Sequence, residues 1–212
     1  IYSNEKEMLS YMIGLALSQY LWSTHYEMFG HLKLSLAQNK NKINKYLEIG
    51  PGHGLFLKSA IDILNKNVEM TAVDISQTSL NVSKSIISHF YPSKNISFIN
   101  KDMLNLSMDF NFDFIVMGEV IEHVEDPKLL LVKISKLLSK SGRAFLSTCV
   151  NCPAIDHVYH FHTVEEIRSM FKECGLAIES EKVLPVEDIS MTEIINQKIT
   201  INYSAIVRRS FE

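Results

Sequence analysis

The sequence predicts an α/β fold with a doubly wound, mostly parallel sheet, and two observations carry that prediction. From residue 45 onward, short apolar runs alternate with helical segments, a pattern typical of parallel strands joined by right-handed helical crossovers. A glycine-rich segment, EIGPGHG, joins the first apolar run to the first of these helices. Glycines at a strand-to-helix turn let a ligand approach the backbone, so this segment is also a candidate binding site.

We expect seven strands, at residues 46–49, 69–73, 96–99, 112–117, 143–148, 177–184 and 198–207. Helices are expected at residues 4–20, 24–38, 55–64, 77–90, 127–138 and 164–174. Asp126 before Pro127 is typical of a helix start, and Thr163 with Glu166 has capping-box spacing. We predict no helix between the last two strands, which should pair antiparallel at the sheet edge.

The chain divides at the polar run NKNKINK, which separates two N-terminal helices from the alternating pattern. We therefore expect a helical segment over residues 1–44 and the α/β domain over residues 45–212. This length is enough to bury a sizeable core without disulfide bonds.

Composition narrows the classes of partner and compartment. The formal net charge of −3 argues against a large nucleic-acid interface. No apolar run reaches the length of a membrane span. Three cysteines give no disulfide framework and suit a reducing cytosol. We expect a cytoplasmic protein with a small-molecule substrate and no nucleic-acid or membrane partner, either a monomer or a homodimer.

The glycine loop and a downstream acid favour one class of ligand. Gly50, Gly52 and Gly54 allow a tight turn, and Asp74 ends the next expected strand, where a carboxylate can accept both ribose hydroxyls. A dinucleotide fingerprint would need its third glycine at position 55, which is Leu55 here. This spacing disfavours a nicotinamide-dependent oxidoreductase.

The pattern Glu-x-Gly-x-Gly-x-Gly resembles the first motif of class I S-adenosylmethionine (SAM)-dependent methyltransferases, and the resemblance extends over residues 45–184. It implies a Rossmann-like fold and SAM as cofactor. The cofactor-binding residues implied are Glu48, Gly50, Gly52, Gly54, Asp74, Ile75, Asp102, Met103 and Glu119. Residues 1–44 fit the family's variable lid, and its aromatics either close over the cofactor or pack inside the lid; they are Tyr20, Trp22, His25 and Tyr26.

Two clusters after the fourth and fifth strands are candidates for chemistry. Glu119, Glu122 and His123 lie in EVIEHV, a pattern similar to that of ubiquinone-biosynthesis O-methyltransferases and of small-RNA 3′-terminal 2′-O-methyltransferases. The resemblance implies a divalent metal, Mg²⁺, Mn²⁺ or Fe²⁺, with His157 or His160 from NCPAIDHVYHFHT as a further ligand. The alternative is a metal-free site in which Glu122 assists and a histidine, His123 or His157, is the general base.

The sequence thus predicts a SAM-dependent methyltransferase that acts on a small molecule, with an oxygen nucleophile and possible metal assistance. The alternatives are an RNA 2′-O-methyltransferase and a catalytically inactive SAM-binding partner subunit. Cys149 and Cys152 form a Cys-x-x-Cys at a strand end. We predict no metal or redox role for them, because no second cysteine pair is present and the motif does not open a helix.

Overall fold

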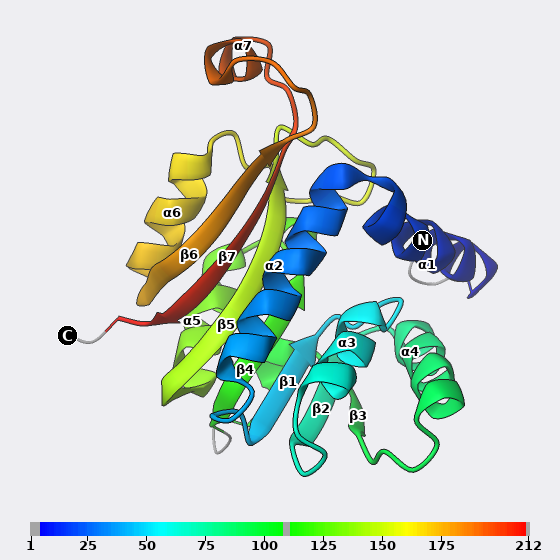
Figure 1. Ribbon diagram of the computed structural model, residues 1–212. Coiled ribbons are helices and arrows are strands. Elements are labelled where there is room, and N and C mark those ends of the chain that lie inside the picture. The colour runs from blue at the N-terminus through cyan, green and yellow to red at the C-terminus, as the bar shows by residue number, and fades with distance from the viewer. Residues whose placement is uncertain (1–4, 108–110, 211–212) are drawn as a thin grey trace.

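The computed structural model describes residues 5–107 and 111–210. Its centre is a seven-stranded sheet with the order β3-β2-β1-β4-β5-β7-β6, shown in Figure 1. The strands are β1 (Lys45–Ile49), β2 (Glu69–Asp74), β3 (Ser97–Asn100), β4 (Phe112–Gly118), β5 (Leu138–Val150), β6 (Leu176–Pro185) and β7 (Ile201–Arg209). The expected doubly wound, mostly parallel α/β sheet is confirmed.

Helices cover both faces of this sheet (Figure 1). They are α1 (Glu5–Leu21), α2 (Ser23–Asn39), α3 (Leu55–Ile63), α4 (Gln77–Phe90), α5 (Pro127–Leu137), α6 (Val164–Glu173) and α7 (Met191–Asn196). Asn4, the expected first residue of the first helix, lies outside the described residues. Strands β1 to β5 and β7 contribute side chains to two apolar cores, one on each face of the sheet. Helices α2 and α3 pack on one face, and α5 and α6 pack on the other.

Local sequence signals set the helix boundaries. The Asp126 carboxylate accepts hydrogen bonds from the backbone N–H groups of Lys128 and Leu129, with Pro127 at the first turn of α5. The Thr163 hydroxyl accepts one from the N–H of Glu166 at the start of α6. Both caps satisfy donors that have no partner inside the helix, and both agree with the sequence prediction.

The prediction of no helix between the last two strands is wrong. The short helix α7 lies there, opened by a capping box in which Ser190 and Glu193 exchange hydrogen bonds. The two strands do pair antiparallel at the edge of the sheet, as expected. Within that pair β7 is the antiparallel strand, and it lies between β5 and the edge strand β6.

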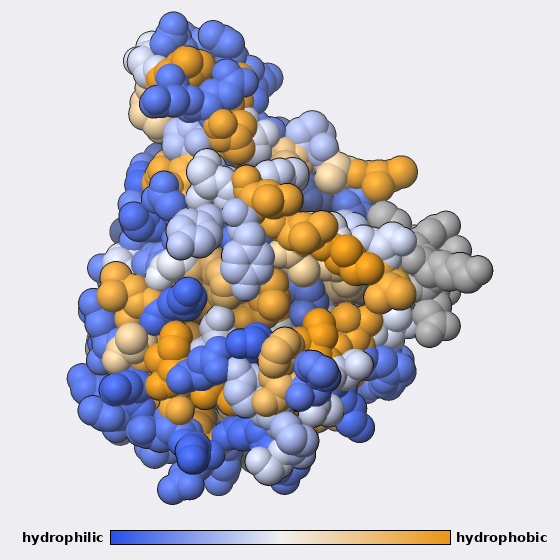
Figure 2. Space-filling view, turned by 45° about the vertical axis from the view of Figure 1, so that its right-hand side comes forward, coloured by the Kyte–Doolittle hydropathy of each residue, from blue (hydrophilic) through white to orange (hydrophobic). Residues whose placement is uncertain are grey.

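The two N-terminal helices differ in their packing. Helix α2 belongs to the core, because Phe29, Leu32 and Leu36 are buried with side chains of α3 and the sheet. Helix α1 contacts α2 and α4 and leaves an apolar face exposed, and Figure 2 shows an orange band on this side of the molecule. None of the described helices is both long and apolar enough to cross a bilayer.

Candidate active site

The candidate site lies at the carboxyl ends of β1, β2, β4 and β5. These strands are mutually parallel, so their carboxyl ends meet at one edge of the sheet, which is where ligands bind in open α/β folds. The glycine loop follows β1, Asp74 ends β2, Glu119 follows β4, and Asn151 follows β5. The topology thus brings the two halves of the sequence-predicted site together.

The three glycines of the loop all have left-handed backbone, with φ of 65° at Gly50, 50° at Gly52 and 72° at Gly54. This region is costly for other residues. A Cβ on Gly50 would lie 2.7 Å from a methyl of Val120, and one on Gly52 would lie 3.3 Å from the sulfur of Met12 in α1. The loop therefore requires glycine, and α1 packs directly on it.

Asp74, the last residue of β2, is held in place by the start of the following helix, α4. Its carboxylate accepts hydrogen bonds from the Ser76 N–H at 2.8 Å and the Ser79 hydroxyl at 2.5 Å. Burial raises the pKa of Asp74, and these two hydrogen bonds oppose the rise. Ile75 beside it is 70% exposed, so its side chain is available to a ligand at this strand end.

The remaining cofactor candidates occupy contrasting environments. Asp102 is exposed and caps a short 3-10 turn through the Leu104 N–H, while Met103 is buried in the core. Glu48 is buried, and the Tyr46 hydroxyl donates a hydrogen bond of 2.5 Å to its carboxylate. Burial raises the pKa of Glu48 to about 8, opposed by hydrogen bonds from Tyr46 and the Leu57 backbone. Through these hydrogen bonds Glu48 connects β1 to the first turns of α3, on the two sides of the glycine loop.

Glu119 and Glu122 form a pair of carboxylates at the end of β4. Glu119 has a φ of 53°, and its carboxylate accepts a hydrogen bond of 2.7 Å from the Ser147 hydroxyl. Glu122 is 1% exposed and accepts one of 2.9 Å from the Thr148 hydroxyl. Burial raises the pKa of Glu119 to about 7. Burial and the Glu119 charge raise that of Glu122 well above its usual value.

Two imidazoles complete this cluster, and each has one nitrogen committed to the backbone. Nδ1 of His123 donates to the Asp156 carbonyl at 2.8 Å, and Nδ1 of His157 donates to the Cys152 carbonyl at 2.7 Å. A carbonyl only accepts, so both Nδ1 atoms carry the proton and both Nε2 atoms keep a lone pair. His123 Nε2 lies 4.0 Å from Glu122 Oε1, and the ligand atoms of Glu122, His123 and His157 lie within 4.8 Å of one another.

A match to a known family model decides the family. A methyltransferase domain model matches residues 40–198, which include the glycine loop, Asp74 and both carboxylate and histidine clusters. The chain belongs to the methyltransferase domain family. This match confirms the resemblance to class I SAM-dependent methyltransferases that the glycine motif predicted.

Relatives of this methyltransferase include ubiquinone biosynthesis O-methyltransferases. That of Idiomarina loihiensis is 28% identical over 106 residues, which are 49% of this chain and 42% of the relative. The mitochondrial enzyme of Schizosaccharomyces pombe is 31% identical over 106 residues, or 49% and 37% of the two chains. The matches thus span less than half the length of these curated relatives.

Solved structures agree on the fold. The N-methyltransferase NodS from Bradyrhizobium japonicum, determined in complex with S-adenosyl-L-homocysteine, superposes with a TM-score of 0.68 at 19% identity, covering 90% of each chain. At this identity the likeness establishes the Rossmann-like architecture of the methyltransferase domain and nothing about the acceptor.

The loop after β5 places one of the two candidate histidines, His157, beside His123. Glu122 anchors it, because the Glu122 carbonyl accepts hydrogen bonds from the N–H groups of Val158 and Tyr159. His157 thereby faces His123, with ring centroids 5.0 Å apart. His160 is exposed, its ring lies 6.5 Å from that of His157, and it belongs to none of the candidate ligand groups found among the described residues.

Several residues of the methyltransferase site were not predicted. His53, inside the glycine motif, is buried, and burial together with the His25 charge lowers its pKa to about 4.

The four aromatic residues expected in the lid differ in exposure. Only His25 is buried, whereas Tyr20, Trp22 and Tyr26 are each about 60% exposed. Met12 could not have been found, because nothing in the sequence places it against Gly52.

Proposed function

We propose that this methyltransferase transfers the methyl group of SAM to a hydroxyl oxygen of a small-molecule acceptor, with a divalent cation held by Glu119, Glu122, His123 and His157. The family match supports SAM as the methyl donor. The O-methyltransferase relatives support oxygen as the nucleophile. The cation is supported by Glu122, His123 and His157, whose ligand atoms lie within 4.8 Å of one another, with Glu119 beside Glu122.

The cofactor side of the proposal places SAM across the carboxyl ends of β1 and β2. The left-handed glycines open the loop so that the amino-acid part of SAM can approach the backbone. The Asp74 carboxylate, held by Ser76 and Ser79, accepts the ribose hydroxyls. Asp102 and Met103 lie beside the adenine, and α1 is the part of the expected lid that closes over the loop through Met12.

The observation that carries the cation proposal is the state of the imidazoles. Histidines that bind a metal through one nitrogen usually donate the other N–H to a carbonyl or carboxylate, and both His123 and His157 do so. Glu122 Oε1 is buried and accepts no hydrogen bond from any residue that the structure describes. Carboxylate oxygens with imidazole nitrogens suit Mg²⁺, Mn²⁺ or Fe²⁺, so this donor set fits the group.

Hydroxyl side chains at the end of β5 hold the carboxylates of the proposed acceptor site in place. The hydroxyls of Ser147 and Thr148 orient the two carboxylates, and two buried negative charges side by side repel each other unless a cation or a proton compensates them. A bound cation would lower the pKa of an acceptor hydroxyl and orient it. His157, whose pKa is lowered by burial, stays neutral near pH 7 and is the rival general base if no cation is needed.

The proposal includes a cytoplasmic location, and all three cysteines are free thiols, which agrees with a reducing compartment. It includes no nucleic-acid partner, because the chain carries a formal net charge of −3.

The test is methyl transfer from SAM to catechol, measured as S-adenosylhomocysteine formed, before and after exhaustive chelation. We expect chelation to abolish turnover while SAM still binds, and Mn²⁺ or Mg²⁺ to restore it. Glu122→Gln keeps the shape but loses the charge, so it should reduce turnover by about 10- to 100-fold, the range typical of damaged metal sites. The exposed Glu125→Gln is the matched control and should retain full turnover.

Two outcomes would contradict the proposal. Full turnover after chelation, with no metal found by elemental analysis, would leave His157 or His123 as a general base without a cation. Methylation of an amine probe in preference to catechol would instead overturn the assignment of oxygen as the nucleophile.

A further inference from the structure

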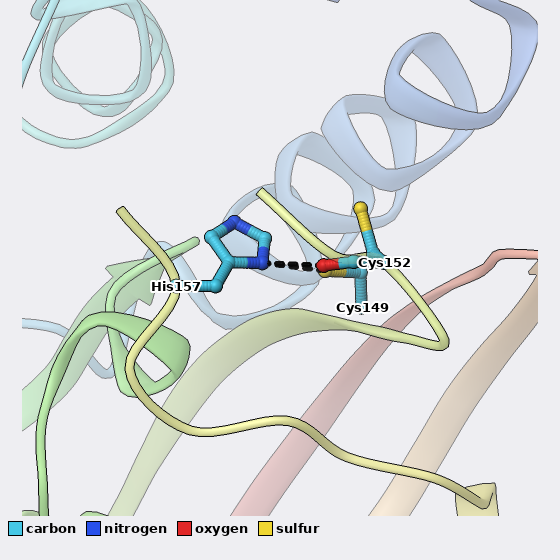
Figure 3. Close-up of side chains that lie close together, drawn as sticks. All are labelled: Cys149, Cys152 and His157. Carbon is cyan, nitrogen blue, oxygen red and sulfur yellow. Dashed lines mark hydrogen bonds between the residues drawn. The ribbon is translucent and has the colours of Figure 1, made fainter. Parts of the chain in front are cut away.

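The end of β5 carries a second group of donor atoms, of which the proposed methyl transfer uses only His157. Cys149 and Cys152 lie beside His157, and the two sulfurs and one imidazole nitrogen lie within 4.8 Å of one another. Figure 3 shows both cysteines on the Nδ1 side of the His157 ring. The distance from Cys149 Sγ to His157 Nδ1 is 4.0 Å.

These separations are close to what a tetrahedral cation requires. Zn–S bonds of about 2.3 Å and Zn–N bonds of about 2.0 Å at tetrahedral angles place neighbouring donors roughly 3.5–3.8 Å apart. The 4.0 Å between Cys149 Sγ and His157 Nδ1 exceeds the sulfur–nitrogen spacing by about half an ångström, which small side-chain shifts would close. Thiolate sulfur with imidazole is a soft donor set, which favours Zn²⁺ over Mg²⁺.

The backbone holds the three donors in place. Cys149 is buried in β5, and Cys152 follows a turn at Asn151, whose φ is 50°. The Asn151 carbonyl accepts a hydrogen bond from the Thr200 hydroxyl, and its N–H donates to the Phe161 carbonyl. A group fixed in this way loses little conformational freedom when it binds a ligand.

We infer that Cys149, Cys152 and His157 form a site for a thiophilic divalent cation such as Zn²⁺. A water molecule or a carboxylate of Glu119 or Glu122 completes four-fold coordination, since both carboxylates have an oxygen within 4.8 Å of Cys149 Sγ. Binding converts two thiols to thiolates and releases two protons. Two thiolates neutralise the cation, so the buried site gains no net charge.

The electrostatics of the cysteine pair agree with this assignment. A hydrogen bond from the Cys149 thiol lowers the pKa of Cys152 to about 7. That same hydrogen bond, with burial and the charges of Glu119 and Glu122, raises the pKa of Cys149. The two sulfurs therefore face each other, and a bound cation would displace the thiol protons, as is usual for zinc sites.

His157 links this site to the proposed oxygen-methylation site. Binding at Nδ1 moves the imidazole proton to Nε2 and breaks the hydrogen bond to the Cys152 carbonyl. Nε2 is then protonated and can no longer bind a cation that Glu119, Glu122 and His123 hold. A cation on the thiols and a cation on the carboxylates thus compete for one histidine, and Zn²⁺ should inhibit turnover supported by Mn²⁺.

The test is a titration of the full chain with Co²⁺, which reports thiolate coordination by charge-transfer absorption in the near ultraviolet. We expect one equivalent of Co²⁺ to give the band and Zn²⁺ to displace it. Cys152→Ser and Cys149→Ser should each lose the band. Cys174→Ser is the matched control, because Cys174 is a buried free thiol at the end of α6, bonded to the Lys128 carbonyl.

The readout does not depend on methyl transfer, so it separates this inference from the proposed function. Glu122→Gln should keep the thiolate band even where it abolishes turnover. If Cys149→Ser fails to fold by circular dichroism, the half-buried Cys152→Ser decides. The inference is overturned if the wild-type protein shows no band at one equivalent, if Cys152→Ser keeps it, or if Cys174→Ser loses it.

Discussion

The glycine loop after β1 and the cluster after β4 and β5 lie at the same edge of the sheet but are held in different ways. The loop depends on backbone conformation, with positive φ at Gly50, Gly52 and Gly54. The cluster depends on buried side chains, among them Glu122 at 1% exposure. The loop is fixed by its backbone geometry. The cluster holds buried carboxylates whose negative charges must be compensated by protons or by a cation.

In the proposed function, the loop half binds the cofactor and the cluster half acts on the acceptor. The loop half contains backbone groups and the carboxylates of Glu48 and Asp74, both of which are fixed by hydrogen bonds. The acceptor half concentrates groups with shifted pKa values, which is where catalytic chemistry is usually located. Substitutions in one half should therefore leave ligand binding in the other half intact.

The largest expected effect is the loss of SAM binding in Gly52→Val. A side chain there must adopt a left-handed backbone, at a cost of roughly 1–2 kcal/mol, and its Cβ would lie 3.3 Å from the Met12 sulfur. We expect calorimetry to show affinity for S-adenosylhomocysteine weakened by more than about 100-fold. The cobalt band of the thiol site should persist.

Gly30→Ala in α2 is the control for this substitution, because a Cβ there meets nothing within 4 Å. It should bind as the wild type does and be slightly more stable, since alanine is the better helix former. Binding of Gly52→Val within a few-fold of the wild type would disprove a close approach of the cofactor at this glycine.

Asp74→Ala should have the next largest effect, again confined to the cofactor half. Removing a charge-assisted acceptor of two ribose hydroxyls costs about 1.5–3 kcal/mol, which is roughly 10- to 150-fold in affinity. Asp62→Ala is the control, an exposed carboxylate paired with Lys58. If both variants bind SAM equally well in calorimetry, the ribose is not held by Asp74.

Glu48, the buried carboxylic acid in β1, predicts how the stability of the fold depends on pH. Its pKa is raised from 4.5 to about 8 in the folded chain. The stability it contributes is therefore fully present below pH 4.5 and is lost as pH rises through 8. We expect the melting temperature to fall over this interval, and to fall less in Glu48→Gln. An equal decline in Glu48→Gln and the wild type would contradict this account.

The backbone geometry of the glycine loop and the place of Asp74 at the end of β2 could be predicted because their signals are local. Positive φ is encoded by glycine itself, and Asp74 follows from the end of an apolar run. The acceptor half was predicted by resemblance, and the choice between His157 and His160 remained open. In the structure His157, and not His160, lies beside His123, because backbone hydrogen bonds from Val158 and Tyr159 to Glu122 fix the loop, and no local pattern encodes these bonds.

The missed helix has a physical cause, and the prediction of no metal role for the two cysteines had a similar basis. The helix α7 has only six residues, too few for a periodic pattern, although Ser190 and Glu193 carry its capping signal. Cys149 and Cys152 were set aside because the sequence shows no second cysteine pair. Their third partner, His157, was visible in the sequence, but its position depends on the fold of residues 151–162.

The smallest expected effect concerns α1, whose proposed role as a lid over the glycine loop is based on the position of Met12 beside Gly52. Its outer face is exposed, with Leu9, Ile13 and Leu17 each about half exposed, while α2 is part of the core. Segments with few buried contacts open more readily than core helices. A ligand that touches both the loop and Met12 should therefore slow amide exchange in α1 by on the order of a few-fold, with α2 unchanged. Hydrogen exchange with and without S-adenosylhomocysteine measures this, and Gly52→Val should show no slowing. Protection in α2 but not α1 would mean that the ligand tightens the core and that α1 is no lid.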